Sequence, residues 1–254
     1  MEVLGIDIGG SGVKGAIVDV KTGELLTSRY RIPTPHPATP EAVLKTVEEI
    51  IEHFEWHGLM GVGYPGVVKG GKTRTAANVH ERWINFPVEM ELERFTGQRV
   101  RVINDADAAG LAEMRFGAGR DRDGVVVMIT LGTGIGVAMF TDGHLVPNLE
   151  LGHIELGGED AEHHAADSAR EREDLSWKKW GKRVDRYLYT LEKLLWPDLF
   201  IIGGGVSKDW NKFAPYLEKV NVEIVPAEMR NQAGIVGAAL AGVYEGNIHT
   251  IAVE

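Results

Sequence analysis

Two glycine-rich segments of the chain have the composition of phosphate-binding turns. Residues 7–15 read DIGGSGVKG and follow a short apolar run, and residues 130–136 read TLGTGIG after another. Glycine lets the backbone approach an anion closely and direct N–H groups at it, and the threonine hydroxyls could add hydrogen bonds. Each segment leads into a further apolar run and not into a helix, which excludes the Rossmann and Walker A motifs. A plain tight hairpin is the alternative for either segment.

Polar side chains in these segments could add a metal ion and contacts to phosphate oxygens. Asp7 stands at the end of the first predicted strand, where its carboxylate could hold a water molecule bound to Mg²⁺. Lys14 or Ser11 could contact a phosphate oxygen. The predicted phosphate-binding residues are Asp7, Gly9, Gly10, Ser11, Gly12, Lys14, Gly132, Thr133 and Gly134.

An Asn-Asp pair lies between the two segments in the chain. Asn104 and Asp105 stand where a short apolar run ends and a helical pattern begins. The Asp105 carboxylate could accept a proton from a sugar hydroxyl, and Asn104 could orient the sugar. Asn and Asp are also preferred at helix N-caps. The spacing alone supports the two interpretations equally.

A third group of polar residues could bind the hydroxyls of a sugar. Residues 150–155, ELGHIE, alternate polar with small or apolar residues, which predicts a strand with His153 and Glu155 on one face. Carboxylate and imidazole groups side by side suit vicinal hydroxyls. A solvent-exposed edge strand is one alternative, and a metal site with His163 and His164 is another. A metal needs converging ligands, and two adjacent histidines on a predicted helix point apart.

Alternating strands and helices position these groups. Helical patterns cover residues 40–57, 106–116, 161–195 and 233–243. Strands are predicted at residues 3–8, 16–20, 25–32, 59–64, 100–103, 125–131, 137–140 and 199–202. This alternation predicts an α/β fold with largely buried sheets.

The chain also contains a faint internal repeat. Gly9 and Asp19 recur 123 residues later as Gly132 and Asp142, each pair in the same strand-turn-strand-turn plan. The repeat predicts two halves of similar plan, with two phosphate hairpins facing each other across a cleft. Chance recurrence of short glycine turns is the alternative.

Composition excludes several classes of protein. The 254 residues contain no cysteine, which excludes disulfides and thiolate metal sites. A net charge of -10 argues against nucleic acid as the main partner. No apolar run approaches the roughly 20 residues of a membrane span, and the N-terminus has no cleavable leader pattern. We therefore expect a cytoplasmic protein without a membrane partner.

Together these motifs resemble the ROK family of sugar kinases (repressor, open reading frame, kinase), within the actin-like ATPase superfamily. The resemblance implies an actin-like, ribonuclease H-like fold of two similar α/β halves around a cleft. It implies domains at residues 1–107 and 108–254, with a terminal helix at about 233–246 packing back on the first. The matching segments are residues 7–15, 63–66, 77–78, 104–105, 131–136, 150–153 and 203–205.

The resemblance also implies roles for single residues. Asp105 would be the general base that activates the 6-hydroxyl of glucose. The residues that would bind sugar hydroxyls are Asn78, Asn104, Asp105, Glu150 and His153. Gly203, Gly204 and Gly205, with residues 234–237, would form the nucleotide pocket.

One departure from the family pattern points to a subgroup. Most members follow the Glu-x-Gly-His element with a cysteine-rich zinc segment that ends in a sugar-binding Glu. Residues 158–173 contain no cysteine, so we expect no zinc site, and Glu171 or Glu155 to replace the terminal Glu. Residues 149–153 and 168–177, with residues 10–15 and Trp180, resemble the polyphosphate-dependent glucokinases.

That subgroup implies a polyphosphate–glucose phosphotransferase that requires Mg²⁺. Its members use inorganic polyphosphate, some of them also ATP, to phosphorylate glucose, some also accept mannose, and they are typically homodimers. Basic residues that could line the path of a phosphate chain, or be ordinary surface charges, are Lys14, Lys69, Lys72, Arg74, Arg115, Arg120 and Arg122.

Two alternatives stay open. The first is a family member that uses ATP alone as a glucokinase, mannokinase or fructokinase. The second, more remote, is a sugar-sensing regulator of the same family. Such regulators carry an N-terminal helix-turn-helix, for which a first strand starting at Val3 leaves no room.

Overall fold

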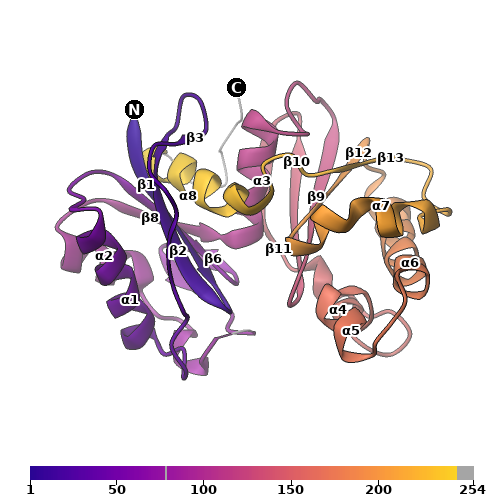
Figure 1. The fold of residues 1–254 in the computed structure, drawn as a ribbon, viewed down its shortest axis with the longest axis horizontal. Helices are drawn as coiled ribbons and strands as arrows, with labels where there is room; N and C mark the ends of the chain where they lie inside the picture. The colour runs from indigo at the N-terminus through magenta and orange to yellow at the C-terminus, as the bar shows by residue number, and fades with distance from the viewer. Residues whose placement is uncertain (78, 245–254) are drawn as a thin grey trace. The chain divides into compact units, whose positions relative to one another are not determined.

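The computed structural model of the chain describes residues 1–77 and 79–244 (Figure 1). Asn78, a predicted sugar ligand, lies outside the described residues. The chain forms two compact units: Met1–Ala112 with the C-terminal helix α8 (Ala233–Val243), and Glu113–Asn231. The division falls within helix α3 (Asp105–Phe116), as does the boundary predicted after residue 107.

The first unit is built on a mixed sheet with the strand order β3-β2-β1-β5-β8, in which β4 also pairs with β2. Its first two strands form an antiparallel hairpin, and β5 and β8 run parallel to β1. The strands are β1 (Glu2–Gly9), β2 (Gly12–Asp19), β3 (Glu24–Leu25), β4 (Tyr30–Ile32), β5 (Met60–Tyr64) and β8 (Val100–Asn104). A separate small hairpin consists of β6 (Val68–Lys69) and β7 (Lys72–Thr73).

Helix α1 (Pro40–His53) starts at strong local signals and packs through one apolar face. The hydroxyl of its N-cap residue Thr39 accepts a hydrogen bond from the N–H of Ala42, and proline occupies its first position. Val43, Val47 and Ile50 recur at helical spacing and are completely buried in the core of this unit. The remaining helices of this unit, besides α8 and the start of α3, are η1 (Glu81–Trp83) and α2 (Val88–Thr96).

Helix α8 packs against strands β1, β5 and β8 at unusually short range. The packing depends on glycine: a Cβ atom added at Gly5 would lie 2.1 Å from the carbonyl oxygen of Ile235, and one at Gly61 would lie 1.7 Å from that of Ala238. Both distances are far inside van der Waals contact. Helix and sheet backbones therefore touch directly in the first unit.

The second unit contains a sheet with the order β11-β10-β9-β12-β13. Its strands are β9 (Val125–Leu131), β10 (Ile135–Thr141), β11 (His144–Leu149), β12 (Leu199–Gly203) and β13 (Glu223–Pro226). The longest helix of this unit, α6 (Trp177–Leu195), buries Trp180, Tyr187 and Leu188 in its core. Shorter helical segments are η2 (Leu151–His153), α4 (Ala161–Ala165), α5 (Asp167–Arg172), η3 (Gly205–Asp209), α7 (Trp210–Phe213), η4 (Ala214–Tyr216) and η5 (Arg230–Gln232).

The two sheets share one plan. In each, an antiparallel hairpin is followed by two strands parallel to its first strand: β1–β2 with β5 and β8, and β9–β10 with β12 and β13. The two glycine-rich turns occupy the same position, at the tip of the hairpin. The predicted α/β fold with two similar halves is therefore confirmed, and the sequence repeat coincides with the structural one.

Several predicted elements differ in extent: the helix predicted at 40–57 ends at His53, the strand predicted at 16–20 spans Gly12–Asp19, and two other elements are divided. The strand predicted at 25–32 is two short strands, because the hydroxyl of Thr27 accepts the hydrogen bond from the N–H of Ile17 in place of a backbone carbonyl. The helix predicted at 161–195 is three helices, because Ala166 and Ser176 have extended backbone conformations.

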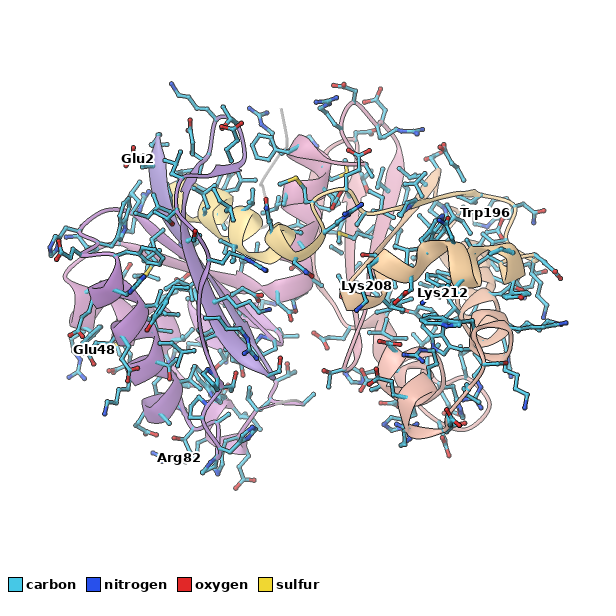
Figure 2. All side chains as sticks on the ribbon, in the orientation of Figure 1. Glu2, Glu48, Arg82, Trp196, Lys208 and Lys212 are labelled. Carbon is cyan, nitrogen blue, oxygen red and sulfur yellow. The ribbon has the colours of Figure 1, made fainter. Side chains whose placement is uncertain are left out.

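Charged side chains such as Arg82 and Lys208 project from the surfaces of the two units (Figure 2). Among the residues that the structure describes, no helix combines the length and the apolar character needed to cross a membrane.

Candidate active site

The parallel strands of the first unit bring Asp7 and Asp105 to one edge of the sheet. Asp7 pairs with Gly63 of β5, and the next residue of β5, Tyr64, pairs with Asn104 at the end of β8. A Cβ atom added at Gly63 would lie 3.7 Å from the Cα atom of Asp105. The carboxyl edge of an open α/β sheet is where ligands usually bind, so both carboxylates stand at a suitable place.

Asn104 caps helix α3 and thereby places Asp105 in its first turn. The side-chain oxygen of Asn104 accepts hydrogen bonds from the N–H groups of Ala106 (2.8 Å) and Asp107 (3.0 Å), and its amide donates to the carbonyl of Gly66 at 3.1 Å. The N-cap interpretation therefore applies to Asn104. Asp105 is the first helical residue and is half-buried; one of its carboxylate oxygens shares the N–H of Ala106 with Asn104, at 2.8 Å.

Asp7 is held between a cation and the N-terminal end of α8. Its carboxylate lies 3.4 Å from the Lys14 ammonium, and a Cβ atom added at Gly234 would lie 3.1 Å from its Cγ atom. Burial raises the pKa of Asp7, although the neighbouring Lys14 opposes this shift. A partly buried carboxylate beside a glycine-rich turn is the kind of group that gains from a cation.

Two side chains hold the carbonyl groups of the first turn. Thr34 donates its hydroxyl to the carbonyl of Gly9 at 2.5 Å, and the Arg31 guanidinium donates to the carbonyl of Ser11 at 2.5 Å. Arg31 also stands opposite Lys14 in the pairing of β4 with β2. Neither residue was predicted from the sequence; the pairing of β4 with β2 brings Arg31 to the turn, and Thr34 follows β4 by two residues.

The second turn lies next to the glycine triplet in the second unit. Gly132 donates its N–H to the carbonyl of Gly134 at 3.0 Å, which makes a tight loop between β9 and β10. Gly204 has a φ of +83°, and a Cβ atom there would lie 2.3 Å from the carbonyl oxygen of Leu131. Glycine is therefore required at position 204, both for its backbone conformation and for this close approach. The structure thus brings Gly203, Gly204 and Gly205 beside the predicted phosphate turn of this unit.

The Glu-x-Gly-His element packs against the end of the same turn. A Cβ atom at Gly152 would lie 2.3 Å from the carbonyl oxygen of Ile135. The element is not the predicted strand: residues 151–153 form the 3₁₀ turn η2, whose tight winding lets Gly152 reach β10. Glu150 and His153 still lie together, with 3.5 Å between Oε2 and Nε2.

Carboxylates that the sequence reasoning missed surround His153. Its Nδ1 atom lies 2.9 Å from Asp160 and 3.8 Å from Glu162. Burial alone would lower the pKa of His153, but the Asp160 hydrogen bond and the charges of Glu162 and Glu150 outweigh it, so the pKa is raised. Burial also raises the pKa of Glu150. No local pattern marks Asp160, which reaches His153 through an isolated bridge between residues 155 and 160.

The two glutamates predicted to complete the sugar site are both exposed. Glu155 forms the isolated bridge with Asp160, and the side chain of Glu171 is 69% exposed with an ion pair to Arg170. Which of the two contacts a sugar stays a prediction. Within residues 1–77 and 79–244, no three His, Asp or Glu side chains converge in a way that could hold a metal.

Removing the Asp160 carboxylate should change the titration of His153. Because the pKa of His153 is raised above its ordinary value of about 6.5, charged His153 stabilises the fold below that pH, and the stabilisation is lost as the pH rises through the raised pKa. In Asp160→Asn we expect the pKa of His153 to fall and this pH-dependent stability to shrink. Proton NMR titration of the imidazole and thermal unfolding between about pH 5 and 8 would measure both.

The neighbouring Glu159 offers a matched control for this titration. Its carboxylate lies 3.3 Å from His164 and not against His153, so Glu159→Gln should leave the His153 titration as it is. An unchanged His153 pKa in Asp160→Asn would refute the assignment of the shift to Asp160.

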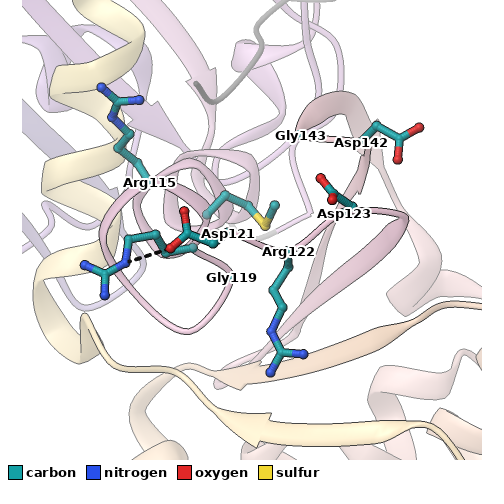
Figure 3. Close-up of a pocket in the computed structure, with 9 residues that line it drawn as sticks. Arg115, Gly119, Asp121, Arg122, Asp123, Asp142 and Gly143 are labelled. Carbon is teal, nitrogen blue, oxygen red and sulfur yellow. Dashed lines mark ion pairs between the residues drawn. The ribbon is translucent and has the colours of Figure 1, made fainter.

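A pocket of about 520 Å³ lies at the other end of the second sheet (Figure 3). Its lining includes Arg115, Arg120, Arg122, Asp123 and the Asp142–Gly143 turn between β10 and β11. The whole length of β9, roughly 23 Å at 3.3 Å per residue, separates that end from the Gly132 turn. Arg122 forms two hydrogen bonds with Glu223, and Arg120 lies 3.7 Å from Asp121. With as many aspartates as arginines in its lining, this pocket has no net charge to attract a phosphate chain.

Known proteins match this chain along most of its length. The ROK family profile matches residues 3–166. The chain is 52% identical over 241 residues to a polyphosphate glucokinase of Mycobacterium tuberculosis, covering 94% of this chain and 91% of the relative. It superimposes on the crystal structure of an inorganic polyphosphate/ATP-glucomannokinase from Arthrobacter sp. strain KM with a TM-score of 0.91, 49% identity, and coverage of 94% and 97% of the two chains. A glucokinase of Streptomyces griseus in complex with glucose and AMPPNP gives a TM-score of 0.79 at 25% identity, covering 95% of this chain and 99% of that one.

Proposed function

The chain belongs to the ROK family, and from this premise we propose that it transfers a phosphoryl group from inorganic polyphosphate to the 6-hydroxyl of glucose. The choice of polyphosphate as the phosphoryl donor rests on one observation. The two relatives whose names include polyphosphate, one of them together with ATP, are about half identical over nearly the whole chain, whereas the glucokinase bound to an ATP analogue is only 25% identical. The two solved structures share the fold of this chain, so the difference in sequence identity supports the choice of donor.

In this proposal Asp105 is the general base. It would accept the proton of the glucose 6-hydroxyl as the oxygen attacks the terminal phosphorus in line with the leaving phosphate. Asn104 fixes the start of α3 and so holds Asp105 in place. The protein mainly positions the reactants and neutralises charge.

The two units supply separate phosphate contacts. The first would contribute Gly9, Gly10, Ser11, Gly12 and Lys14, and the second Gly132, Thr133 and Gly134. Asp7 fits a Mg²⁺ held through water, because Mg²⁺ keeps several waters and needs only one or two carboxylates besides substrate phosphates. When bound, the ion neutralises charge that develops on the phosphate oxygens.

Several polar residues are the sugar ligands of this proposal. Asn78, Asn104, Glu150 and His153 would bind sugar hydroxyls, with Glu155 or Glu171 as a further ligand. ATP would place its nucleoside beside Gly203, Gly204 and Gly205. Mannose as a second substrate, a homodimeric assembly and independence from zinc are parts of the same proposal.

The donor is tested by offering each candidate alone. With long-chain polyphosphate as sole donor, we expect glucose 6-phosphate to form at least as efficiently as with ATP, measured by a coupled dehydrogenase assay. Turnover with ATP and none with polyphosphate would contradict the proposal in favour of an ATP-dependent sugar kinase.

Salt should affect polyphosphate use more than ATP use. A polyanion held by even two cations releases bound counterions, so its apparent affinity should fall roughly tenfold between 50 and 200 mM salt. Steady-state KM values for long polyphosphate, tripolyphosphate and ATP across this range provide the measurement, with ATP as the control. Equal salt sensitivity of all three would contradict a path of several cationic contacts.

A further inference from the structure

Ser168, at the start of α5, holds two consecutive carbonyl groups of the second phosphate turn. Its backbone N–H donates to the carbonyl of Gly132 at 3.1 Å, and its hydroxyl donates to the carbonyl of Thr133 at 2.7 Å. Ser168 begins the segment 168–177 that carries the resemblance to the subgroup, but it lies 35 positions beyond Thr133 and no sequence pattern links it to the turn. One residue therefore makes two hydrogen bonds to the loop predicted to face the terminal phosphate.

Peptide geometry converts these bonds into an orientation of N–H groups. A trans peptide unit is planar, and its carbonyl and N–H point in opposite directions. Because the Gly132 carbonyl points to Ser168, the N–H of Thr133 points the other way. Because the Thr133 carbonyl also points to Ser168, the N–H of Gly134 likewise points away from Ser168. Two successive donors are thus directed to the side of the turn opposite Ser168, and two carbonyl oxygens that would repel a phosphate are turned away from it.

The segment that carries Ser168 is anchored firmly enough to impose this geometry. The indole N–H of the fully buried Trp180 donates to the carbonyls of Ala165 (3.1 Å) and Ala166 (3.0 Å), immediately before α5. On the far side of the turn, the N–H of Ile135 donates to Glu162 at 3.2 Å. The stretch from Glu162 to Ser168 therefore fixes both ends of the loop.

We propose that Ser168 is a positioning residue for the phosphoryl donor, which orients the N–H groups of Thr133 and Gly134 toward the phosphate. The inference rests on the proposed function but not on the identity of the donor. A phosphate of ATP and a phosphate of polyphosphate present the same oxygens to these N–H groups. Ser168 lies on the other side of the loop and itself contacts no phosphate.

The test compares Ser168→Ala with Ser168→Thr, which keeps the hydroxyl. Loss of one hydrogen bond that orients the loop should raise the KM for polyphosphate and for ATP about tenfold, the equivalent of roughly 1.4 kcal/mol. The dissociation constant for glucose, measured by intrinsic fluorescence without donor, should stay within about twofold. Ser168→Thr should recover most of the donor affinity.

Ser176 provides the matched control. It caps the adjacent helix α6 by accepting a hydrogen bond from the N–H of Lys179 at 3.4 Å, in the same part of the chain. Ser176→Ala should lower the thermal midpoint slightly and leave the KM of both donors unchanged. A purely structural role for Ser168 would instead weaken glucose and donor binding together.

Two outcomes would overturn the inference: unchanged donor KM values in Ser168→Ala, or a parallel loss of glucose affinity. Direct binding of tripolyphosphate by calorimetry separates this inference from the donor proposal. If the wild-type chain uses only ATP, the polyphosphate proposal fails, while the effect of Ser168→Ala on the KM for ATP still decides the role of Ser168.

Discussion

Replacing Asp105 with asparagine should lower kcat for glucose phosphorylation by about a thousandfold while the protein stays folded. A positioned general base contributes roughly 10²–10⁴ to the rate, and asparagine cannot accept the proton. The loss should appear in kcat rather than in the dissociation constant of glucose, because proton transfer stabilises only the transition state. The side chain that caps α3 is that of Asn104, so the helix keeps its N-terminal hydrogen bonds.

Steady-state kinetics, glucose binding and circular dichroism on the same preparation would test this expectation. Asp121→Asn is a suitable control, because that side chain is 90% exposed and should leave kcat unchanged. Asn104→Ala should instead lower the stability of the fold. It removes the side-chain oxygen that accepts hydrogen bonds from two N–H groups, at a cost of about 1 kcal/mol in the free energy of unfolding. Near-normal turnover in Asp105→Asn would remove Asp105 from the role of base.

The parts of the fold that could be predicted are those with a local signature. Strand β9 and helix α8 have the predicted bounds, residues 125–131 and 233–243, because continuous apolar runs flanked by glycine and polar residues define them. The two glycine-rich turns follow from glycines placed directly after such strands. In each case neighbouring residues carry enough information to determine the element.

The Asn104-Asp105 pair shows where a sequence pattern leaves the choice open. Both residue types favour N-caps, so propensity could not separate a cap from a base. The structure assigns the cap to Asn104, whose side chain contacts Ala106, Asp107 and Gly66. Asn104 reaches Gly66 because Tyr64, two residues before Gly66, pairs with Asn104. This contact depends on the register of β5 against β8, which the local sequence does not reveal.

The residues near the second turn that the sequence did not predict make contacts with residues distant in the chain. Asp160 reaches His153, and Ser168 reaches Gly132 and Thr133, without any periodic pattern that links the partners. The alternation in residues 150–155 even predicted a strand, which packing of Gly152 against Ile135 overrides. Tertiary contacts of this kind follow from the fold and not from local propensity.

Replacing Gly61 with alanine should destabilise the first unit by about 3 kcal/mol or more, at the upper end of what overpacking causes. The new Cβ atom would lie 1.7 Å from the carbonyl oxygen of Ala238 and 3.0 Å from the backbone nitrogen of Gly242. Neither atom belongs to a side chain that could rotate away, so α8 must shift as a whole from β5. For a chain of this size such a loss corresponds to a fall in Tm of roughly 6–12 °C.

Gly63→Ala is the matched control, because Gly63 lies two residues further along β5, with its added Cβ at an ordinary 3.7 Å from Asp105. Both substitutions remove the same backbone freedom from the unfolded chain, a gain of about 0.4–1 kcal/mol where the site accepts alanine. The difference between the two variants in thermal or urea unfolding therefore measures the contact with α8 alone. Similar stability of Gly61→Ala and Gly63→Ala would show that α8 can move off β5 at little cost, and direct backbone contact would then not be what holds α8 to the sheet.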